Sequence, residues 1–210
     1  RRRGPAALLI PRDVFAEEVP ARPADWPTCL ADFEDQRAPS ESALTMLEAK
    51  LAAAQRPVII AGADVRVGPA RQALTSFARR AQVPVVTTLS DINAFPAQEP
   101  LYLGTVGTAG HPSAHRYLNE EADLLVVAGT QLELMHRMPI MAALERCEVV
   151  ILAEDVELGQ RIVPKAECIA ADIGLTFQAL LERRPARPTG SGRPKGYELE
   201  RFLPQLAVQV

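Results

Sequence analysis

The fold of this chain is decided by RPVIIAGADVRVGPA (residues 56–70), QVPVVTTLSDINAFPAQEPLYLGTVGTAG (82–110) and ADLLVVAG (122–129). Two apolar runs in these stretches, Pro57–Ala61 and Leu124–Ala128, each stop on a glycine. Continuous apolar runs that end on glycine are typical of strands buried on both faces, with a turn at the carboxyl end. Their alternation with helices predicts a doubly wound parallel α/β sheet, whose ligands bind beyond the carboxyl ends of the strands.

The rest of the hydrophobic pattern predicts a six-stranded sheet with helices on both faces. Apolar runs predict strands at 58–61, 83–88, 101–103, 124–128, 148–152 and 167–170. Helical spacing of apolar residues predicts helices at 40–55, 69–82, 112–119, 139–145 and 173–183, with a helical turn at 157–161. Between the second and third strands we expect an irregular loop at 89–100.

The 210 residues suffice for one domain with a sizeable core and some additional segments. We expect this domain at 40–184. Residues 1–39 are expected to hold a short strand at 6–10 and then an extended, proline-rich linker. Residues 185–210, which include RPTGSGRPKG, are expected to be a flexible linker and tail. The lack of an initiator methionine suggests a fragment of a longer chain.

Composition and charge exclude several classes of function. The net charge of −3 gives no reason to expect nucleic acid as a partner. No apolar run approaches the ~20 residues that cross a bilayer, and no secretory signal is present, so we expect no membrane partner and a cytoplasmic location. Cys29, Cys147 and Cys168 are far apart and in no metal-ligand spacing, which predicts reduced thiols.

Three glycines follow the weak third strand: Gly104, Gly107 and Gly110, spaced GxxGxxG. This is not the dinucleotide fingerprint, which has a different spacing and follows the first strand. Glycine lets backbone N–H groups approach a phosphate or a flat ring without a Cβ atom in the way. The same glycines also suit a tight loop with positive φ angles, so ligand contact and a purely structural turn are both open.

A second candidate site lies at the ends of the first and fourth strands. In the usual doubly wound sheet, Gly62–Asp64 and Gly129–Gln131 end neighbouring strands at the point where the strand order reverses. The crevice between such turns is the usual binding place, and the helix near Pro69 would aim its positive end toward it. Glu154 after the fifth strand could accept ribose hydroxyls or lie in a solvated turn. We expect Asp172, after the sixth strand, to cap the last helix.

The histidines and nucleophiles form no known catalytic pattern. His111 and His115 have the i, i+4 spacing of metal-binding helix pairs, but Pro112 begins that helix and no acidic third ligand stands nearby. We therefore expect no metal site. No Ser-His-Asp order, GxSxG elbow, CxxC pair or Walker loop occurs. The sequence predicts a nucleotide-shaped scaffold without a self-contained active site.

Five segments, in this order, resemble the central domain of thiamine-diphosphate-dependent enzymes: RPVIIAGADV, VPVVTTLSDINAFP, EPLYLGTVGTAG, EADLLVVAGTQL and IAADI. The likeness is strongest to acetolactate synthase large subunits and their decarboxylase relatives, and it spans about 40–183. The leading GPAALLIPRDVF resembles the last strand of the pyrimidine-binding domain that precedes the central domain there. The resemblance implies a six-stranded, doubly wound, DHS-like NAD/FAD-binding domain between two domains that bind thiamine diphosphate.

The resemblance also implies where the chemistry lies. In this family the glutamate that activates the cofactor belongs to the first flanking domain, and the GDG-to-Asn motif that holds magnesium and diphosphate belongs to the last. Neither pattern occurs in this chain. Thiamine diphosphate and Mg²⁺ would therefore be bound by the parent enzyme outside this fragment. The implied partners are the missing domains and, in an intact homo-oligomer, further copies of the chain; the implied substrates are 2-oxo acids.

Central domains of this family hold FAD without a redox role, hold ADP, or are empty. The positions that match the family's nucleotide contacts are Gly62, Ala63, Asp64, Thr88, Leu89, Ser90, Gly107, Gly110, Gly129, Thr130, Asp172 and Ile173. Three departures count against FAD: Gln131 stands where an arginine is expected, Ala109 where a histidine is, and Leu152 where an acid is. Glu154 could replace that acid. Losing a charged partner for a diphosphate costs ~1.5–3 kcal/mol, so FAD, an adenine nucleotide without flavin, and an empty crevice all stay open.

The alternative function is a free-standing nucleotide-binding protein with the same sheet, such as an electron-transfer flavoprotein-like or sirtuin-like NAD-binding domain. This alternative predicts a cofactor that stays bound through purification. A sirtuin-like deacylase also needs a catalytic histidine and usually a zinc-binding cysteine set. The three separated cysteines do not supply such a set.

Overall fold

The computed structural model describes residues 7–18, 37–66 and 69–183, together with residues 188, 192 and 194–195. The chain forms two compact units, residues 1–36 and residues 37–210. In the first unit the described residues include a short helix, α1 (Arg12–Phe15). No helix within these described ranges is both long and apolar enough to cross a membrane.

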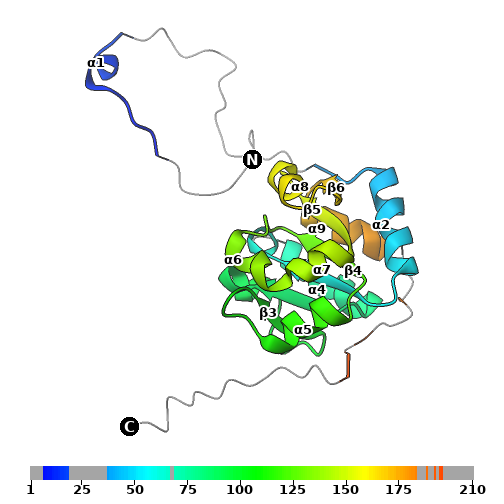
Figure 1. The fold of residues 1–210 in the computed structure, drawn as a ribbon. Helices are drawn as coiled ribbons and strands as arrows, with labels where there is room; N and C mark the ends of the chain where they lie inside the picture. Colours follow the sequence, from blue (N-terminus) through cyan, green and yellow to red (C-terminus); the bar gives the residue numbers. More distant parts are fainter. Residues whose placement is uncertain are drawn as a thin grey trace, which may run out of the picture. The chain divides into compact units, whose positions relative to one another are not determined.

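The second unit contains a sheet of parallel strands. The strands are β1 (Pro57–Ala61), β2 (Val85–Thr88), β3 (Tyr102–Val106), β4 (Leu124–Ala128), β5 (Glu148–Ala153) and β6 (Glu167–Ala170). Their order across the sheet is β3-β2-β1-β4-β5-β6 (Figure 1), and each neighbouring pair is parallel. The prediction of a six-stranded, doubly wound parallel sheet is confirmed, and the strand order reverses between β1 and β4.

Helices cover both faces of this sheet (Figure 1). One face carries α2 (Glu41–Ala53), α4 (Ala70–Ala81) and α9 (Ile173–Glu182). The other carries α5 (Pro112–Glu120), α7 (Met141–Arg146) and α8 (Glu157–Ile162). Shorter helical segments lie in the connections: α3 (Ala63–Arg66), η2 (Leu89–Ala94), α6 (Leu134–Arg137) and η3 (Met138–Ile140).

Two separate cores result, because successive side chains of a strand point to opposite faces of the sheet. In β1, Ile59 packs into the core that includes α4 and α9, whereas Val58 and Ile60 pack into the core that includes α5 and α7. Every residue of β1 and β4 is buried. Burial on both faces explains why these strands read as continuous apolar runs rather than as an alternating pattern.

The amino end of the β1–β4 pair is fixed by a carboxylate. Asp123, just before β4, accepts hydrogen bonds from the backbone N–H groups of Gln55 and Arg56, at 2.7 and 2.9 Å. Hydrogen bonds to a charged acceptor are stronger than neutral ones. They hold the connection between α2 and β1 beside the start of β4.

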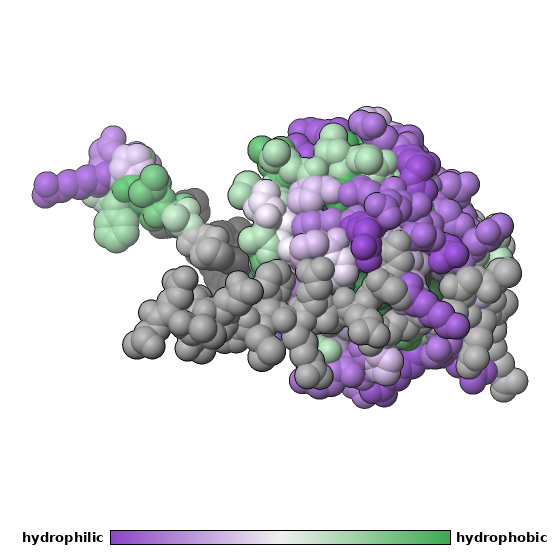
Figure 2. All heavy atoms as spheres, turned by 60° about the horizontal axis from the view of Figure 1, so that its bottom comes forward, coloured by the Kyte–Doolittle hydropathy of each residue, from purple (hydrophilic) through white to green (hydrophobic). Residues whose placement is uncertain are grey.

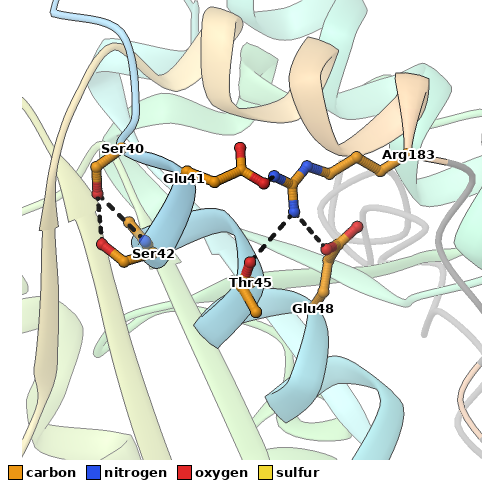
Figure 3. A network of polar contacts seen from close by, with 7 residues as sticks. Ser40, Glu41, Ser42, Thr45, Glu48 and Arg183 are labelled. Carbon is orange, nitrogen blue, oxygen red and sulfur yellow. Dashed lines mark hydrogen bonds and ion pairs between the residues drawn. The ribbon is translucent and has the colours of Figure 1, made fainter.

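Polar contacts join α2 to the end of α9 (Figure 3). Ser40 caps α2, since its Oγ accepts a hydrogen bond from the Ala43 N–H at 3.2 Å. Arg183, directly after α9, donates to Glu48 Oε2 at 2.7 Å and also to the carboxylate of Glu41. Hydrogen bonds to these two glutamates, with Glu48 having the larger effect, raise the pKa of the Arg183 guanidinium.

The strand expected at 6–10 is wrong over its described part. Residues 7–10 belong to no strand, and Leu8 and Leu9 are 83% and 92% exposed. An apolar segment needs a partner strand for its backbone N–H and C=O groups, and no described strand pairs with this one. Most of the linker expected at 17–39 and of the tail expected at 185–210 lies outside the described residues.

The carboxyl edge of the sheet is more helical than expected. The expected turn Gly62–Asp64 leads directly into α3, and the expected loop 89–100 begins with η2. The helix expected at 139–145 is divided into η3 and α7, with α6 before them. Segments of three to six residues are too short to show a helical period in the sequence, which explains these differences.

Phe77 provides a test of the core between α4 and α9. Its ring is fully buried, and its centroid lies 5.2 Å from that of Phe177. We expect Phe77→Ala to lower the free energy of unfolding by about 3–5 kcal/mol, measured by urea denaturation. Phe15→Ala is the matched control: Phe15 is 77% exposed, so its loss should cost less than about 0.5 kcal/mol. Equal effects of the two substitutions would contradict a packed α4–α9 core.

Candidate functional site

The residues predicted to contact a ligand all lie at or just after the carboxyl ends of strands. They are Gly62, Ala63 and Asp64 after β1; Thr88, Leu89 and Ser90 at the end of β2; Gly107 and Gly110 after β3; Gly129, Thr130 and Gln131 after β4; Glu154 after β5; and Asp172 and Ile173 after β6. Because the strands are parallel, these ends share one edge of the sheet. β1 and β4 lie in the middle of that edge.

The turns after β1 and β4 contact each other directly. The Asp64 N–H donates to Gly129 O at 3.1 Å, and the Gly62 N–H donates to Ala128 O at 2.9 Å. A Cβ atom added to Gly62 would lie 2.3 Å from the Cβ of Thr130. Gly62 is therefore required by the approach of the β4 turn, and no ligand is needed to explain it.

Gly129 has a similar explanation. Its φ of 66° is in the left-handed region that favours glycine. An added Cβ would lie 2.8 Å from Ile173 Cδ1 and 3.0 Å from the Cβ of Asp64. Ile173 and Asp64, which are themselves predicted ligand contacts, thus pack against Gly129. The atoms that leave no room for a Cβ at Gly62 or Gly129 belong to the protein itself.

Side chains at the ends of β2 and β6 also have partners within the chain. The Thr88 hydroxyl donates to Asp91 Oδ2 at 3.2 Å, and Asp91 Oδ1 lies 3.7 Å from Nε of Arg66 in α3. Asp172 caps α9 as predicted, because its Oδ1 accepts from the Leu175 N–H at 2.8 Å. These groups hold neighbouring segments of the edge together.

The acidic side chain that follows β5, that of Glu154, lies outside the buried core. Leu152, which stands where an acid is expected in related domains, is fully buried inside β5. Glu154 follows the strand and is exposed. An ionised carboxylate at the Leu152 position would be buried in an apolar core, whereas the side chain of Glu154 is exposed.

The GxxGxxG loop packs against the histidines of the chain. A Cβ on Gly104 (φ 109°) would lie 2.8 Å from the ring of His111, and one on Gly110 would lie 2.8 Å from Nε2 of His115. Gly107 (φ 139°) has the ring of His136 3.5 Å from its added Cβ. Gly104 and Gly110 thus leave room for an imidazole, whereas His136 is at ordinary contact distance from the Cβ position of Gly107. These contacts give a physical basis to the alternative in which the glycines form a purely structural turn. Gly104 lies within β3 rather than after it.

Two of these imidazoles accept hydrogen bonds from the backbone. His111 Nδ1 accepts from the Thr105 N–H at 3.0 Å, and His115 Nε2 accepts from the Gly107 N–H at 3.3 Å. A ring nitrogen can accept only when it carries no proton. Burial, and then the neighbouring His111, lower the pKa of His115. Both effects favour the neutral ring, which can accept the hydrogen bond from the Gly107 N–H.

His136 is a buried residue of this edge that the sequence did not single out. It is 5% exposed, and its Nε2 lies 3.0 Å from the Ser90 hydroxyl. Its Nδ1 has no hydrogen-bond partner among the described residues. A catalytic serine–histidine pair needs a third group that orients the imidazole, so this pair is not a triad. No sequence motif marks His136, because its position depends on how α6 packs beside η2.

Metal-ligand and thiol chemistry find no support in the described part of the chain. It holds no group of three or more histidine, cysteine or acidic side chains arranged to bind a metal ion. Cys147 and Cys168 are free, and burial raises the pKa of both thiols, which lowers their reactivity. Cys29 lies outside the described residues.

The sheet order and the helices on both faces define a class of protein: a doubly wound α/β domain. Residues 44–180 match the family model of the thiamine pyrophosphate enzyme central domain. The chain belongs to this family.

Relatives of known name agree with this assignment. The chain is 35% identical to acetolactate synthase isozyme 1 large subunit of Escherichia coli K12 over 63% of its own length and 22% of the relative. It is 30% identical to acetolactate synthase 1, chloroplastic, of Zea mays over 100% of its length and 35% of the relative. The chain therefore spans between about a fifth and about a third of these relatives.

A solved structure supports the fold alone. It comes from Mycobacterium smegmatis, and its description names a thiamin diphosphate-dependent enzyme. The two chains superpose with a TM-score of 0.58 at 20% sequence identity, over 79% of this chain and 30% of the other.

His115 makes the stability of the glycine loop depend on pH. Its folded-state pKa is below its usual value, so the unfolded chain binds the proton more readily. The stabilisation is complete above the usual histidine pKa of about 6.5 and is lost as the pH falls from there toward the folded-state pKa. We expect the melting temperature of the wild type to fall more steeply between about pH 6.5 and 5 than that of His115→Gln. Parallel curves would show that His115 does not contribute.

Proposed function

We propose that this chain is the central, non-catalytic domain of a thiamine-diphosphate-dependent carboligase or decarboxylase that acts on 2-oxo acids. The observation that carries this proposal is the family match over residues 44–180, which include all six strands. The acetolactate synthases among the relatives support a parent enzyme of this reaction class. The comparisons give no support to a free-standing nucleotide-binding protein.

In this proposal the domain is a structural spacer. Residues 40–184 form the spacer, residues 1–39 belong to the end of the preceding domain and its linker, and residues 185–210 lead toward the following domain. Thiamine diphosphate and Mg²⁺ are bound by those other domains of the parent chain. What the described residues contribute is a rigid body, built from a sheet with two buried cores.

The residues of the switch point favour an empty crevice over one that holds FAD. The space that a Cβ atom would need at Gly62 and Gly129 is filled by Thr130, Asp64 and Ile173, so neither glycine needs a ligand to explain it. Gln131 offers no positive charge to a diphosphate. Thr88 and Asp172, two further expected contacts, are engaged with Asp91 and the N–H of Leu175. We propose that this crevice holds no FAD and that the domain has a structural role in the parent enzyme.

The reaction class is tested by comparing two proteins from one gene. We expect this chain alone to release no CO₂ from pyruvate or other 2-oxo acids with thiamine diphosphate and Mg²⁺. The same chain extended by its flanking coding sequence should turn over at least one 2-oxo acid. The flanks should also encode the activating glutamate and the GDG motif. Turnover by the chain alone, or flanks that lack both features, would overturn the proposal.

The proposal that the crevice holds no FAD is tested by absorption spectroscopy and by thermal melting. The purified chain should show no visible flavin absorption, and FAD or ADP in millimolar excess should not raise its melting temperature, since only a ligand that binds the folded state stabilises it. A stoichiometric flavin spectrum would contradict the proposal that the crevice is empty. A melting shift with ADP alone would show that the chain binds an adenine nucleotide but no flavin.

A further inference from the structure

A cavity of about 580 Å³ lies between α7 and α8, away from the switch point. Its apolar lining comes from Met141 and Leu144 of α7 and from Ile162, Val163 and Pro164 at the end of α8. Leu144 and Val163 are each 5% exposed. Binding pockets for small molecules have volumes of about 300–1,000 Å³ and mostly apolar walls with a few polar groups, and this cavity has both properties.

Three cations line the same cavity: Arg137, Arg161 and Lys165. Glu145 is the acidic residue of the lining, so the formal charge of the lining is 3 − 1 = +2. Within the described part of the chain, none of the three cations forms an ion pair. Elsewhere in the second unit, cations such as Lys50 and Arg79 do pair with carboxylates.

Two of these cations are held in place by backbone carbonyls. The Lys165 ammonium donates to the carbonyl oxygens of Glu145 and of Cys147, the latter at 2.8 Å. Arg137 Nη1 donates to Leu132 O at 3.2 Å. Carbonyl oxygens position a cation without neutralising it, so the positive charge at the cavity stays available to an anion. Arg161 is exposed at the end of α8.

We propose that this cavity binds a small organic anion with a carboxylate or phosphate head and a short apolar tail. The tail lies against Leu144, Ile162 and Val163, and the head contacts the cations. The site lies on the face of the sheet covered by α5, α7 and α8 and shares no residue with the switch point. It goes beyond the proposed spacer role and does not depend on it.

Matched probes with one tail and different heads test the charge preference. We would titrate this chain with hexanoate, hexyl phosphate, hexanol and hexylammonium at low salt, and follow methyl resonances by NMR. The two anions should shift the methyl signals of Leu144, Ile162 and Val163, and should bind at least about tenfold more tightly than hexanol, because a charged head adds charge-assisted hydrogen bonds. Hexylammonium should not bind.

A substitution locates the head group. Arg161→Gln should weaken both anions about fivefold or more, because it removes one charged donor, and should leave the melting temperature unchanged. Arg71→Gln is the matched control: Arg71 is exposed on α4, on the opposite face of the sheet, and its loss should not affect binding.

Three results would overturn the proposal. The first is that neither anion shifts these methyl signals at millimolar concentration. The second is equal binding of hexanol and hexanoate, which would make the cavity purely apolar. The third is equal weakening by the two arginine substitutions, which would indicate only a general charge effect. The wild-type titration decides the question even if a variant folds poorly.

Discussion

The pairing of β1 with β4 is the constraint on which the rest of the second unit depends. The two strands are neighbours in space although β2 and β3 are formed between them in the chain. Asp123 fixes the amino end of the pair, and the two glycine turns fix its carboxyl end. The two turns are hydrogen-bonded to each other and are so close that neither glycine has room for a Cβ atom. Neither turn can therefore change shape without moving the other. The β1–β4 pair joins the half of the sheet formed by β1, β2 and β3 to the half formed by β4, β5 and β6.

Much of the fold could be predicted because burial on two faces leaves a strong signal. β4 and β6 begin and end where the apolar runs predict, and Ser40 and Asp172 cap the helices expected to follow them. The apolar run at residues 7–10 was misleading for a physical reason. Hydrophobicity favours a strand only when another strand accepts its hydrogen bonds, and a local pattern carries no information about that partner.

The candidate site could be predicted less well, because a glycine can be required at a position for several different physical reasons. The sequence placed the candidate residues at the carboxyl ends of the strands, and the structure has them at that edge of the sheet. It could not say whether the space beside Gly62 is filled by a ligand or by Thr130, since both require the same residue. His136 was missed because its burial depends on α6, which is only four residues long. The cavity between α7 and α8 has no motif at all, since its lining combines segments far apart in sequence.

The hydrophobic surface of the second unit is also unevenly distributed (Figure 2). Exposed large apolar side chains in this unit include Leu134, Met135, Met138 and Met141, all between the end of β4 and the first residue of α7. Methionine adapts to irregular neighbours. This distribution agrees with the proposal that the domain is a spacer between other domains of a longer chain.

The contacts of Arg183 with Glu41 and Glu48 have a consequence for how such a unit can be inherited. The residue that ends α9 touches the helix with which the sheet domain begins. The start of α2 and the end of α9 are therefore side by side. A module with adjacent termini can be spliced into a longer gene, or exchanged for a homologous one, without forcing the host protein to stretch across it.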